Sequence, residues 1–144
     1  IVAGALGTLI GLERDLSGKD PSLRTFALIC MASCLFSIIS RDSVINSPAG
    51  DPSRIAAQIV TGIGFIGAGA IFKSRKRVSG LTTAALMWIT AAIGMVVGFR
   101  RGDLALAATI LALVFNFLLH KVHSATHRIR MARGLISESS DDED

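Results

Sequence analysis

The side chains that could do chemistry in this sequence are sorted by position: charged residues stand at the ends of long apolar runs, and uncharged polar residues lie inside them. A proton relay or cation pathway normally carries an acid or a histidine within such a run, because the group is costly there and is kept for function. No run contains one, and none pairs a nucleophile with a base, which argues against a simple ion transporter and an enzyme. The polar residues inside the runs are Thr25, Ser33, Ser37, Gln58, Thr61, Thr82, Thr83, Thr90, Thr109 and Asn116.

The charged ends form two groups, Glu13, Arg14 and Arg24 in one and Asp51 and Arg54 in the other. Glu13 ends the first apolar run, where its negative charge opposes the helix dipole and needs a cation nearby. Arg24, across the following loop, is the predicted partner. The alternative is that all five are ordinary span ends whose side chains reach toward lipid headgroups.

Three histidines in the tail, His120, His123 and His127, are spaced three and four residues apart and project from one face of a helix. Two such imidazoles can share a metal ion. No carboxylate or thiolate stands nearby, so a face beside lipid headgroups is the stronger interpretation. We expect no metal and no other cofactor.

Two further patterns match known sites only by letter. Residues 62–67 (GIGFIG) fit a dinucleotide fingerprint but lie inside an apolar run, and no acidic residue follows until Asp103. Cys30 and Cys34 lie four apart in an apolar run, which favours small packing residues over a disulfide or redox pair.

The elements that carry these residues are predicted to be membrane-spanning helices. Hydrophobic residues make up 51% of the chain and the mean hydropathy is +0.56, too apolar for an ordinary soluble domain of 144 residues. The Asp-Pro pairs at 20–21 and 51–52 are typical helix starts, and Asp103 should cap the last span. The predicted fold is an all-α bundle of five spans at about 1–12 (its start missing before Ile1), 23–39, 55–72, 81–99 and 104–119.

Positive charges predict the orientation. The loops after the first and third spans, together with the tail, hold 11 of the 15 Lys and Arg residues. Basic loops stay in the cytoplasm, so the N-terminus is predicted to lie outside the cell membrane and the tail inside. The net charge of +4 is spread over these short clusters, which does not favour nucleic-acid binding.

The third span is predicted to be the packing centre of the protein. Glycine is about 1 kcal/mol worse than alanine in a helix, so its concentration here needs a reason. Small residues let a neighbouring backbone approach closely in a membrane. The sequence leaves open whether the docked helix is internal, a second copy or a foreign subunit. The small residues are Ala57, Thr61, Gly62, Gly64, Gly67, Ala68 and Gly69, and a second stripe in the first span comprises Ala3, Gly7 and Gly11.

The tail differs in composition from the predicted transmembrane domain, residues 1–120. Residues 121–136 are basic with interspersed apolar positions, which suits a helix lying along anionic headgroups. Residues 137–144 are acidic, lack apolar side chains and are expected to be disordered.

Four motifs, at 11–15 (GLERD), 23–28 (LRTFAL), 51–72 and 80–94, resemble the MgtC/SapB family of bacterial inner-membrane proteins. The resemblance covers about residues 1–100. It implies a five-span protein linked to growth in low magnesium, acid tolerance and, in pathogens, survival in macrophages. For the MgtC branch it also implies binding to the proton-translocating ATP synthase and its restraint.

Carried over by motif, the resemblance also implies functional polar positions, with Trp88 and the glycines as scaffold. The family usually has Ala-Gly where this chain has Pro21-Ser22, and often a polar residue at Phe26. The short tail favours a SapB-like member with the membrane domain only. The implied polar positions are Glu13, Arg14, Arg24, Thr25, Asp51, Arg54, Gln58, Thr82 and Thr83.

The predicted function is therefore a non-enzymatic membrane regulator linked to magnesium limitation or acid stress. The alternative is a transporter or channel subunit for Mg²⁺ or protons, acting as an oligomer with Gln58, Thr61 and the glycines along the pathway. Predicted partners are membrane lipid and either a second copy of the chain or a membrane subunit of ATP synthase.

Overall fold

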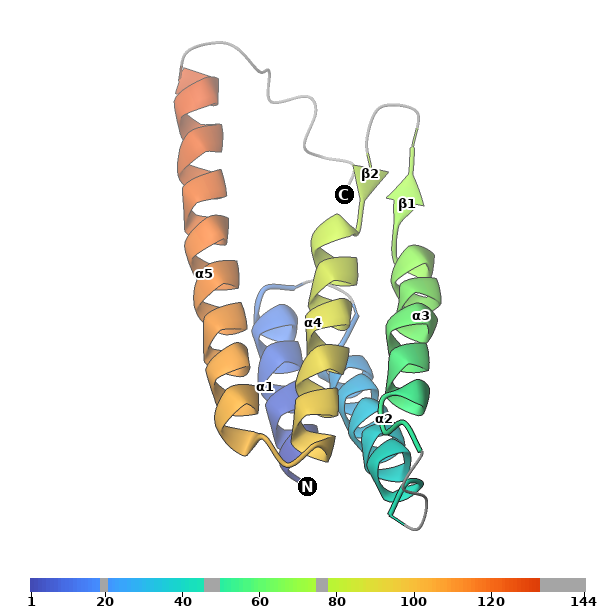
Figure 1. Ribbon diagram of the computed structural model, residues 1–144. Coiled ribbons are helices and arrows are strands. Elements are labelled where there is room, and N and C mark those ends of the chain that lie inside the picture. Colours follow the sequence, from blue (N-terminus) through green and yellow to red (C-terminus); the bar gives the residue numbers. More distant parts are fainter. Residues whose placement is uncertain (19–20, 46–49, 75–77, 133–144) are drawn as a thin grey trace. The chain divides into compact units, whose positions relative to one another are not determined.

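The computed structural model describes residues 1–18, 21–45, 50–74 and 78–132, with side chains described through residue 119 and at Lys121. The chain forms two units, residues 1–112 and 113–144, and the last helix belongs to both. The described part is all-helical apart from a two-stranded ribbon, which confirms the predicted all-α class (Figure 1). Its elements are α1 (Val2–Leu16), α2 (Leu23–Asp42), α3 (Arg54–Gly69), β1 (Phe72–Lys73), β2 (Val78–Ser79), α4 (Leu81–Gly98) and α5 (Gly102–Ala132).

Three of the described helices are long and apolar enough to cross a bilayer: α2, α4 and residues Gly102–Leu119 of α5. Helix α3 is apolar but has only 16 residues, and α1 has 15. A helix rises about 1.5 Å per residue, so both fall short of a hydrocarbon core about 30 Å thick. The count of five spans stays a prediction.

Several predicted boundaries were wrong. Helix α1 continues to Leu16 instead of ending at residue 12, and α3 ends at Gly69 instead of residue 72. The basic segment after α3 forms an antiparallel ribbon, in which Phe72 pairs with Ser79. Gly80 then turns the chain into α4 with φ +83°, and a side chain there would overlap the carbonyl of Ala70.

The helix starts also differ from prediction. Asp20 lies outside the described residues, and the cap positions of α2 and α3 are Ser22 and Ser53 rather than the predicted aspartates. Asp103 lies within the first turn of α5, one residue after its start. Helix α5 runs on to Ala132 because its sequence contains no proline or internal glycine to end it earlier.

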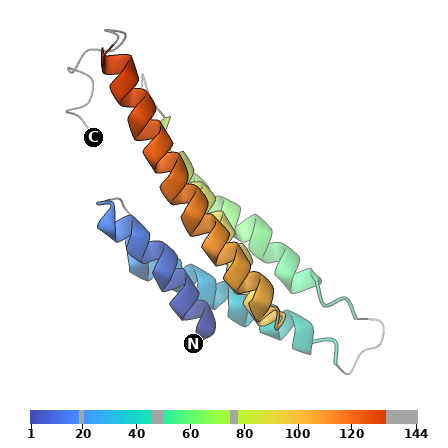
Figure 2. The ribbon, with the colours of Figure 1, turned by 90° about the vertical axis from the view of Figure 1, so that its left-hand side faces the viewer.

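Helix α2 is the centre of the first unit and contacts α1, α3 and α4. Helix α1 lies antiparallel along its first half (Figure 2), with buried Ala3, Gly7 and Gly11 facing it. A β-carbon at Gly7 would come within 2.6 Å of the Phe26 carbonyl oxygen, and one at Gly11 would overlap Leu23. The predicted second stripe of small residues is therefore where α1 and α2 meet.

Helix α4 packs on another face of α2 through two glycines. A β-carbon at Gly94 would overlap the carbonyl oxygen of Cys30, and one at Gly98 would lie 2.6 Å from that of Cys34. Cys30 is buried between Gly7 and Gly94, which fits its predicted role as a small packing residue, and Cys34 is half-buried. Backbone contact this close requires glycine on one helix and a small side chain on the other.

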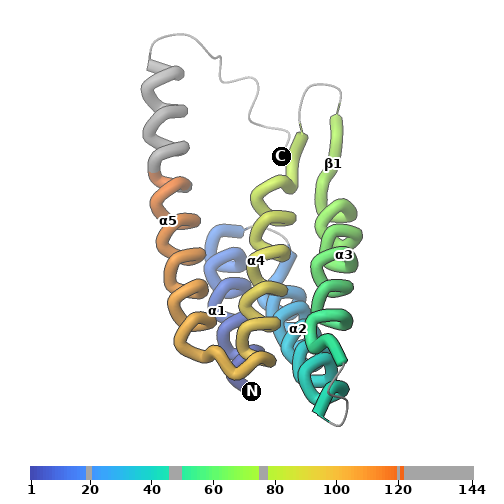
Figure 3. The backbone as a smooth tube through the Cα atoms, viewed as in Figure 1, coloured from blue at the N-terminus to red at the C-terminus, as the bar shows by residue number. Residues whose placement is uncertain are grey.

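The prediction that α3 is the packing centre was wrong for contacts within the chain. Helix α3 runs antiparallel to α4, to which the ribbon joins it (Figure 3). It buries only Ala56, Ile63 and Gly67. Gly67 faces Ala84 of α4 at ordinary contact distance, whereas a β-carbon at Gly62, Gly64 or Gly69 would meet nothing within 4 Å. Most of the predicted packing residues of α3 thus point away from the described remainder of the chain.

Candidate functional site: two polar clusters at opposite ends of α2

The predicted polar residues separate into two clusters about the length of α2 apart. The hairpin-end cluster lies where α1 ends and α2 and α4 begin, and the turn-end cluster lies where α2 ends and α3 begins. Twenty helical residues span about 30 Å, so the two clusters cannot form one site. The hairpin-end cluster holds Glu13, Arg14, Arg24, Thr25, Thr82 and Thr83, and the turn-end cluster holds Asp51, Arg54 and Gln58.

Arg14 is the most deeply buried charged residue of the hairpin-end cluster, with 4% of its surface exposed. Its Nη2 donates a hydrogen bond of 2.9 Å to the Oγ1 of Thr83, which is also buried, and this bond joins α1 to α4. Its Nε is buried without a hydrogen-bond partner. A buried cation that is only partly satisfied is costly, so its presence needs a structural or functional reason.

The predicted pair of Glu13 and Arg24 was wrong, since no hydrogen bond or ion pair joins these two described residues. Glu13 accepts a hydrogen bond of 3.2 Å from the Ser17 hydroxyl, and Arg24 is exposed. Asp15 makes the contact across the loop instead, because its Oδ1 accepts a 3.2 Å hydrogen bond from the backbone N–H of Leu23. This carboxylate satisfies a free donor at the start of α2.

Thr25 and Thr82, the remaining residues of the hairpin-end cluster, are less buried than Arg14 and Thr83. Thr25 is half-buried, and Thr82 is exposed in the first turn of α4. Of the six predicted residues, the structure thus joins Arg14 and Thr83 directly.

The turn-end cluster is open. Asp51, Arg54 and Gln58 line a polar hollow of about 520 Å³ at the start of α3. The Oδ1 of Asp51 accepts hydrogen bonds from the Ser53 hydroxyl (2.6 Å) and the Ser53 backbone N–H (2.9 Å). These bonds hold the pKa of the Asp51 carboxyl below its usual value, and the nearby Arg54 cation adds to the effect. Asp51 therefore keeps its negative charge in mildly acidic solution.

Two residues that sequence reasoning missed tie the helices together at the turn end. The buried Ser40 hydroxyl donates to the Pro52 carbonyl oxygen at 2.6 Å and accepts from the Ala56 N–H at 3.3 Å, which links α2 to α3. Arg41 donates to the Gly98 carbonyl oxygen at 2.8 Å, which links α2 to the end of α4. The sequence signal for both residues was their position directly after the predicted span 23–39. We did not include them in that span.

The interior of the first unit offers few free polar groups. The hydroxyls of Thr8, Ser37, Thr90 and Thr109 each donate to the carbonyl four residues earlier in their own helix. No group of three metal-ligating side chains occurs among the described residues. The side chains of His120, His123 and His127 lie outside that description.

Comparison with known proteins gives a consistent result. The chain is 45% identical over 134 residues to "Putative magnesium transporter YhiD" of Escherichia coli K12, covering 90% of this chain and 61% of that protein. It is 46% identical over 121 residues to "Protein MgtC" of Salmonella typhimurium strain 14028s, covering 84% of this chain and 51% of that protein. An uncharacterized protein of Haemophilus influenzae is 39% identical over 135 residues, covering 89% of this chain and 57% of that protein.

The chain thus spans between half and about three-fifths of the length of these relatives. No solved structure matches it. The MgtC family matches residues 1–125. This match extends the resemblance carried by the four sequence motifs through the predicted fifth span, and the chain belongs to the MgtC family.

Proposed function

We propose that this chain is a multi-pass protein of the bacterial inner membrane that regulates another membrane protein during magnesium limitation or acid stress. It acts through helix contacts and not by catalysis. Its relatives include one named as a putative magnesium transporter and the MgtC protein, which supports the link to magnesium. The proposed target is a membrane subunit of the proton-translocating ATP synthase, as the family resemblance implies for the MgtC branch.

The observation that carries this proposal is the outward face of α3, formed by Ala57, Thr61, Gly64 and Ala68. All four residues are exposed in the described chain. Faces of small residues are where helices associate in a bilayer, because the backbones can approach closely. A face built this way but left open within the chain fits contact with a second polypeptide.

The proposed topology has five spans, with the N-terminus outside and the tail in the cytoplasm. The loop charge bias supports it. It can be tested in a variant whose Cys30 and Cys34 are replaced by alanine. We expect Ser43→Cys to react with an impermeant thiol reagent added to intact cells and Ser74→Cys to be protected. The reverse labelling pattern would contradict the orientation.

The functional proposal is tested by Gly64→Leu, with Phe65→Leu as its matched control. Phe65 is 84% exposed, and a β-carbon at position 64 would meet nothing within 4 Å in the described chain. We expect both variants to accumulate in the membrane. Gly64→Leu should lose growth at low magnesium or low pH and lose the co-purifying subunit, while Phe65→Leu should keep both. Full activity of Gly64→Leu would refute the proposal.

A transporter is the second candidate, and the printed name of the Escherichia coli relative favours it. The two functions predict different results in liposomes containing the purified chain and a Mg²⁺ indicator. Under the regulatory proposal, Mg²⁺ entry should equal that of empty liposomes. Saturable uptake that requires Gln58 would support transport instead.

A further inference from the structure

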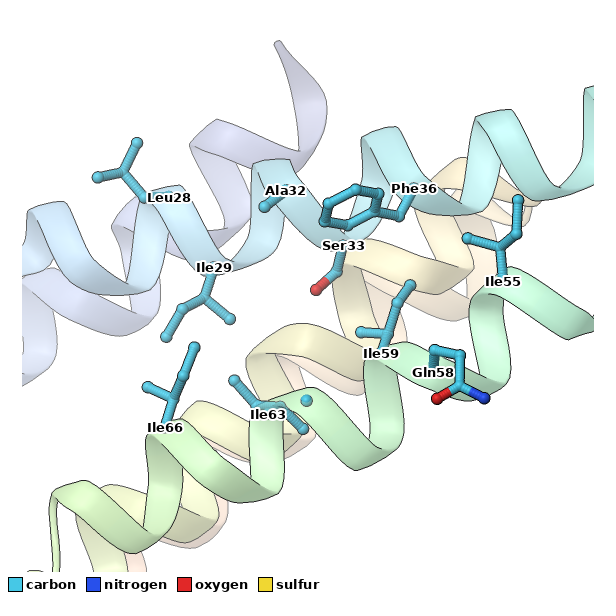
Figure 4. Close-up of a pocket in the computed structure, with 11 residues that line it drawn as sticks. Leu28, Ile29, Ala32, Ser33, Phe36, Ile55, Gln58, Ile59, Ile63 and Ile66 are labelled. Atoms are coloured by element: carbon cyan, nitrogen blue, oxygen red, sulfur yellow. The ribbon is translucent and has the colours of Figure 1, made fainter.

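An apolar groove between α2 and α3 leads into the polar hollow of the turn-end cluster. The groove has a volume of about 510 Å³, and it shares two lining residues, Ile55 and Gln58, with the hollow. Figure 4 shows Ile29 of α2 and Ile59, Ile63 and Ile66 of α3 directed into the space between the two helices. One continuous surface therefore changes from apolar to charged along the helix pair.

The apolar part suits a thin hydrocarbon chain better than a protein helix. A helix with its side chains is about 10–12 Å across, so 510 Å³ would hold only about one turn of it. The groove runs beside α2, which is long and apolar enough to cross a bilayer, and therefore opens toward hydrocarbon. In that solvent, acyl chains are the available molecules of this shape.

The polar part carries one charge of each sign. The guanidinium of Arg54 makes no hydrogen bond or ion pair with any residue of the described chain, and Asp51 uses only Oδ1 in its bonds to Ser53. Guanidinium groups bind phosphate oxygens well, and a carboxylate accepts hydrogen bonds from a primary ammonium. The dipole at the start of α3 also favours an anion there. This pairing complements a zwitterionic headgroup.

We propose that the α2–α3 groove binds one membrane phospholipid whose headgroup carries a primary amine. One acyl chain lies along Ile59 and Ile63, Arg54 binds the phosphate, and Asp51 accepts hydrogen bonds from the ammonium. A quaternary ammonium has no N–H to donate to Asp51, and an anionic headgroup without an amine leaves that carboxylate opposed to like charge. The site should therefore select an amine-bearing headgroup.

The test uses the full chain, delipidated in detergent and mixed with equal amounts of phosphatidylethanolamine, phosphatidylcholine and phosphatidylglycerol. Retained lipid is counted by native mass spectrometry. We expect one phosphatidylethanolamine per chain, enriched by at least about tenfold over the other two, the ratio that one charge-assisted hydrogen bond produces. Equal retention of the three lipids by the wild-type chain would overturn the proposal.

Matched variants locate the site. Arg54→Gln should lose retained phospholipid, and Asp51→Asn should lose the preference for the primary amine. Arg101→Gln, an exposed arginine at the start of α5, should behave as wild type. A wild-type lipid pattern in Asp51→Asn, with an unchanged melting temperature, would refute the headgroup assignment.

The acyl chain is tested separately from the headgroup. Gly62 lines the groove and Gly69 does not, and a β-carbon at either would meet nothing within 4 Å in the described chain. Gly62→Leu should fill the groove and reduce lipid retention, while Gly69→Leu should not. Equal retention by both would show that the groove is not the binding site. Neither variant alters the outward face of α3, so this result is independent of the regulatory proposal.

Discussion

The glycines of α4 and those of α3 are in opposite situations. Gly94 and Gly98 press against the backbone of α2, and a β-carbon at either would collide with it. Gly62 and Gly64 also lie in an apolar helix, yet nothing in the described part of the chain comes within 4 Å of a β-carbon there. The α2–α4 contact is thus completed within the chain. Gly62 and Gly64 therefore cost helix stability without a packing contact in the described chain, which indicates a role outside the chain.

The most direct test of this difference is to place leucine at one glycine of α4 and at one glycine of α3. Gly94→Leu must push α2 and α4 apart at a backbone carbonyl, and overpacking of this kind typically costs about 1–3 kcal/mol or more. We expect Gly94→Leu to be largely absent from the membrane and Gly64→Leu to be present at wild-type level, measured by quantitative immunoblot. Similar levels of the two proteins would contradict the assignment of internal and external faces.

Loss of the hydrogen bond between Arg14 and Thr83 should have the next largest effect on stability. Thr83→Val removes the acceptor for a buried charged donor, which costs about 1.5–3 kcal/mol, and should lower the melting temperature in detergent. Arg14→Met removes the buried charge altogether and should leave that temperature unchanged or raised. If Arg14→Met were the more destabilising of the two, its guanidinium would have partners beyond Thr83.

Ser40 links α3 to α2 by hydrogen bonds. Replacing it should lower stability by less than Thr83→Val does. Ser40→Ala removes two hydrogen bonds worth about 0.5–1.5 kcal/mol each, and the effect should be confined to α3. We expect faster amide hydrogen exchange in α3 and unchanged exchange in α4. Thr90→Ser, which keeps a buried hydroxyl in α4, is the control. Equal acceleration in α3 and α4 would mean that α3 is not a separate edge helix.

The smallest expected effect concerns the exposed Asp51. Its folded pKa lies below the usual value of 3.8, so its contribution to stability is present above that value and is lost as the pH falls through the lower, folded pKa. Ser53→Ala removes the bond from the Ser53 hydroxyl, the largest cause of the lowered pKa, and leaves the bond from the Ser53 backbone N–H in place. Carboxyl NMR titration should show the Asp51 midpoint move upward, toward the usual value. An unchanged midpoint would mean that the Ser53 hydroxyl does not lower this pKa.

The polar residues of the candidate site were largely recognisable in the sequence, but their partners were not. Glu13 and Arg24 have complementary charges across a short loop, yet Asp15 makes the contact across that loop. Arg14 stands beside Glu13 in sequence but points into the interior, where it reaches Thr83, 69 residues away. Complementary charges and a short loop show which ion pairs are possible. The rotation of each helix about its axis decides which side chains face one another.

By itself, the sequence determined the all-α class, the apolar character of the helices, the start of α4 and the family, because these follow from composition, local periodicity and motif. It also identified the close-packing stripe of α1 and the small packing residue Cys30. Only the tertiary structure decided that α2 is the central helix and that Gly94 and Gly98 close its contact with α4. A stripe of small residues looks the same in sequence whether it is covered or open, because the partner that covers it lies elsewhere in the chain or in another protein.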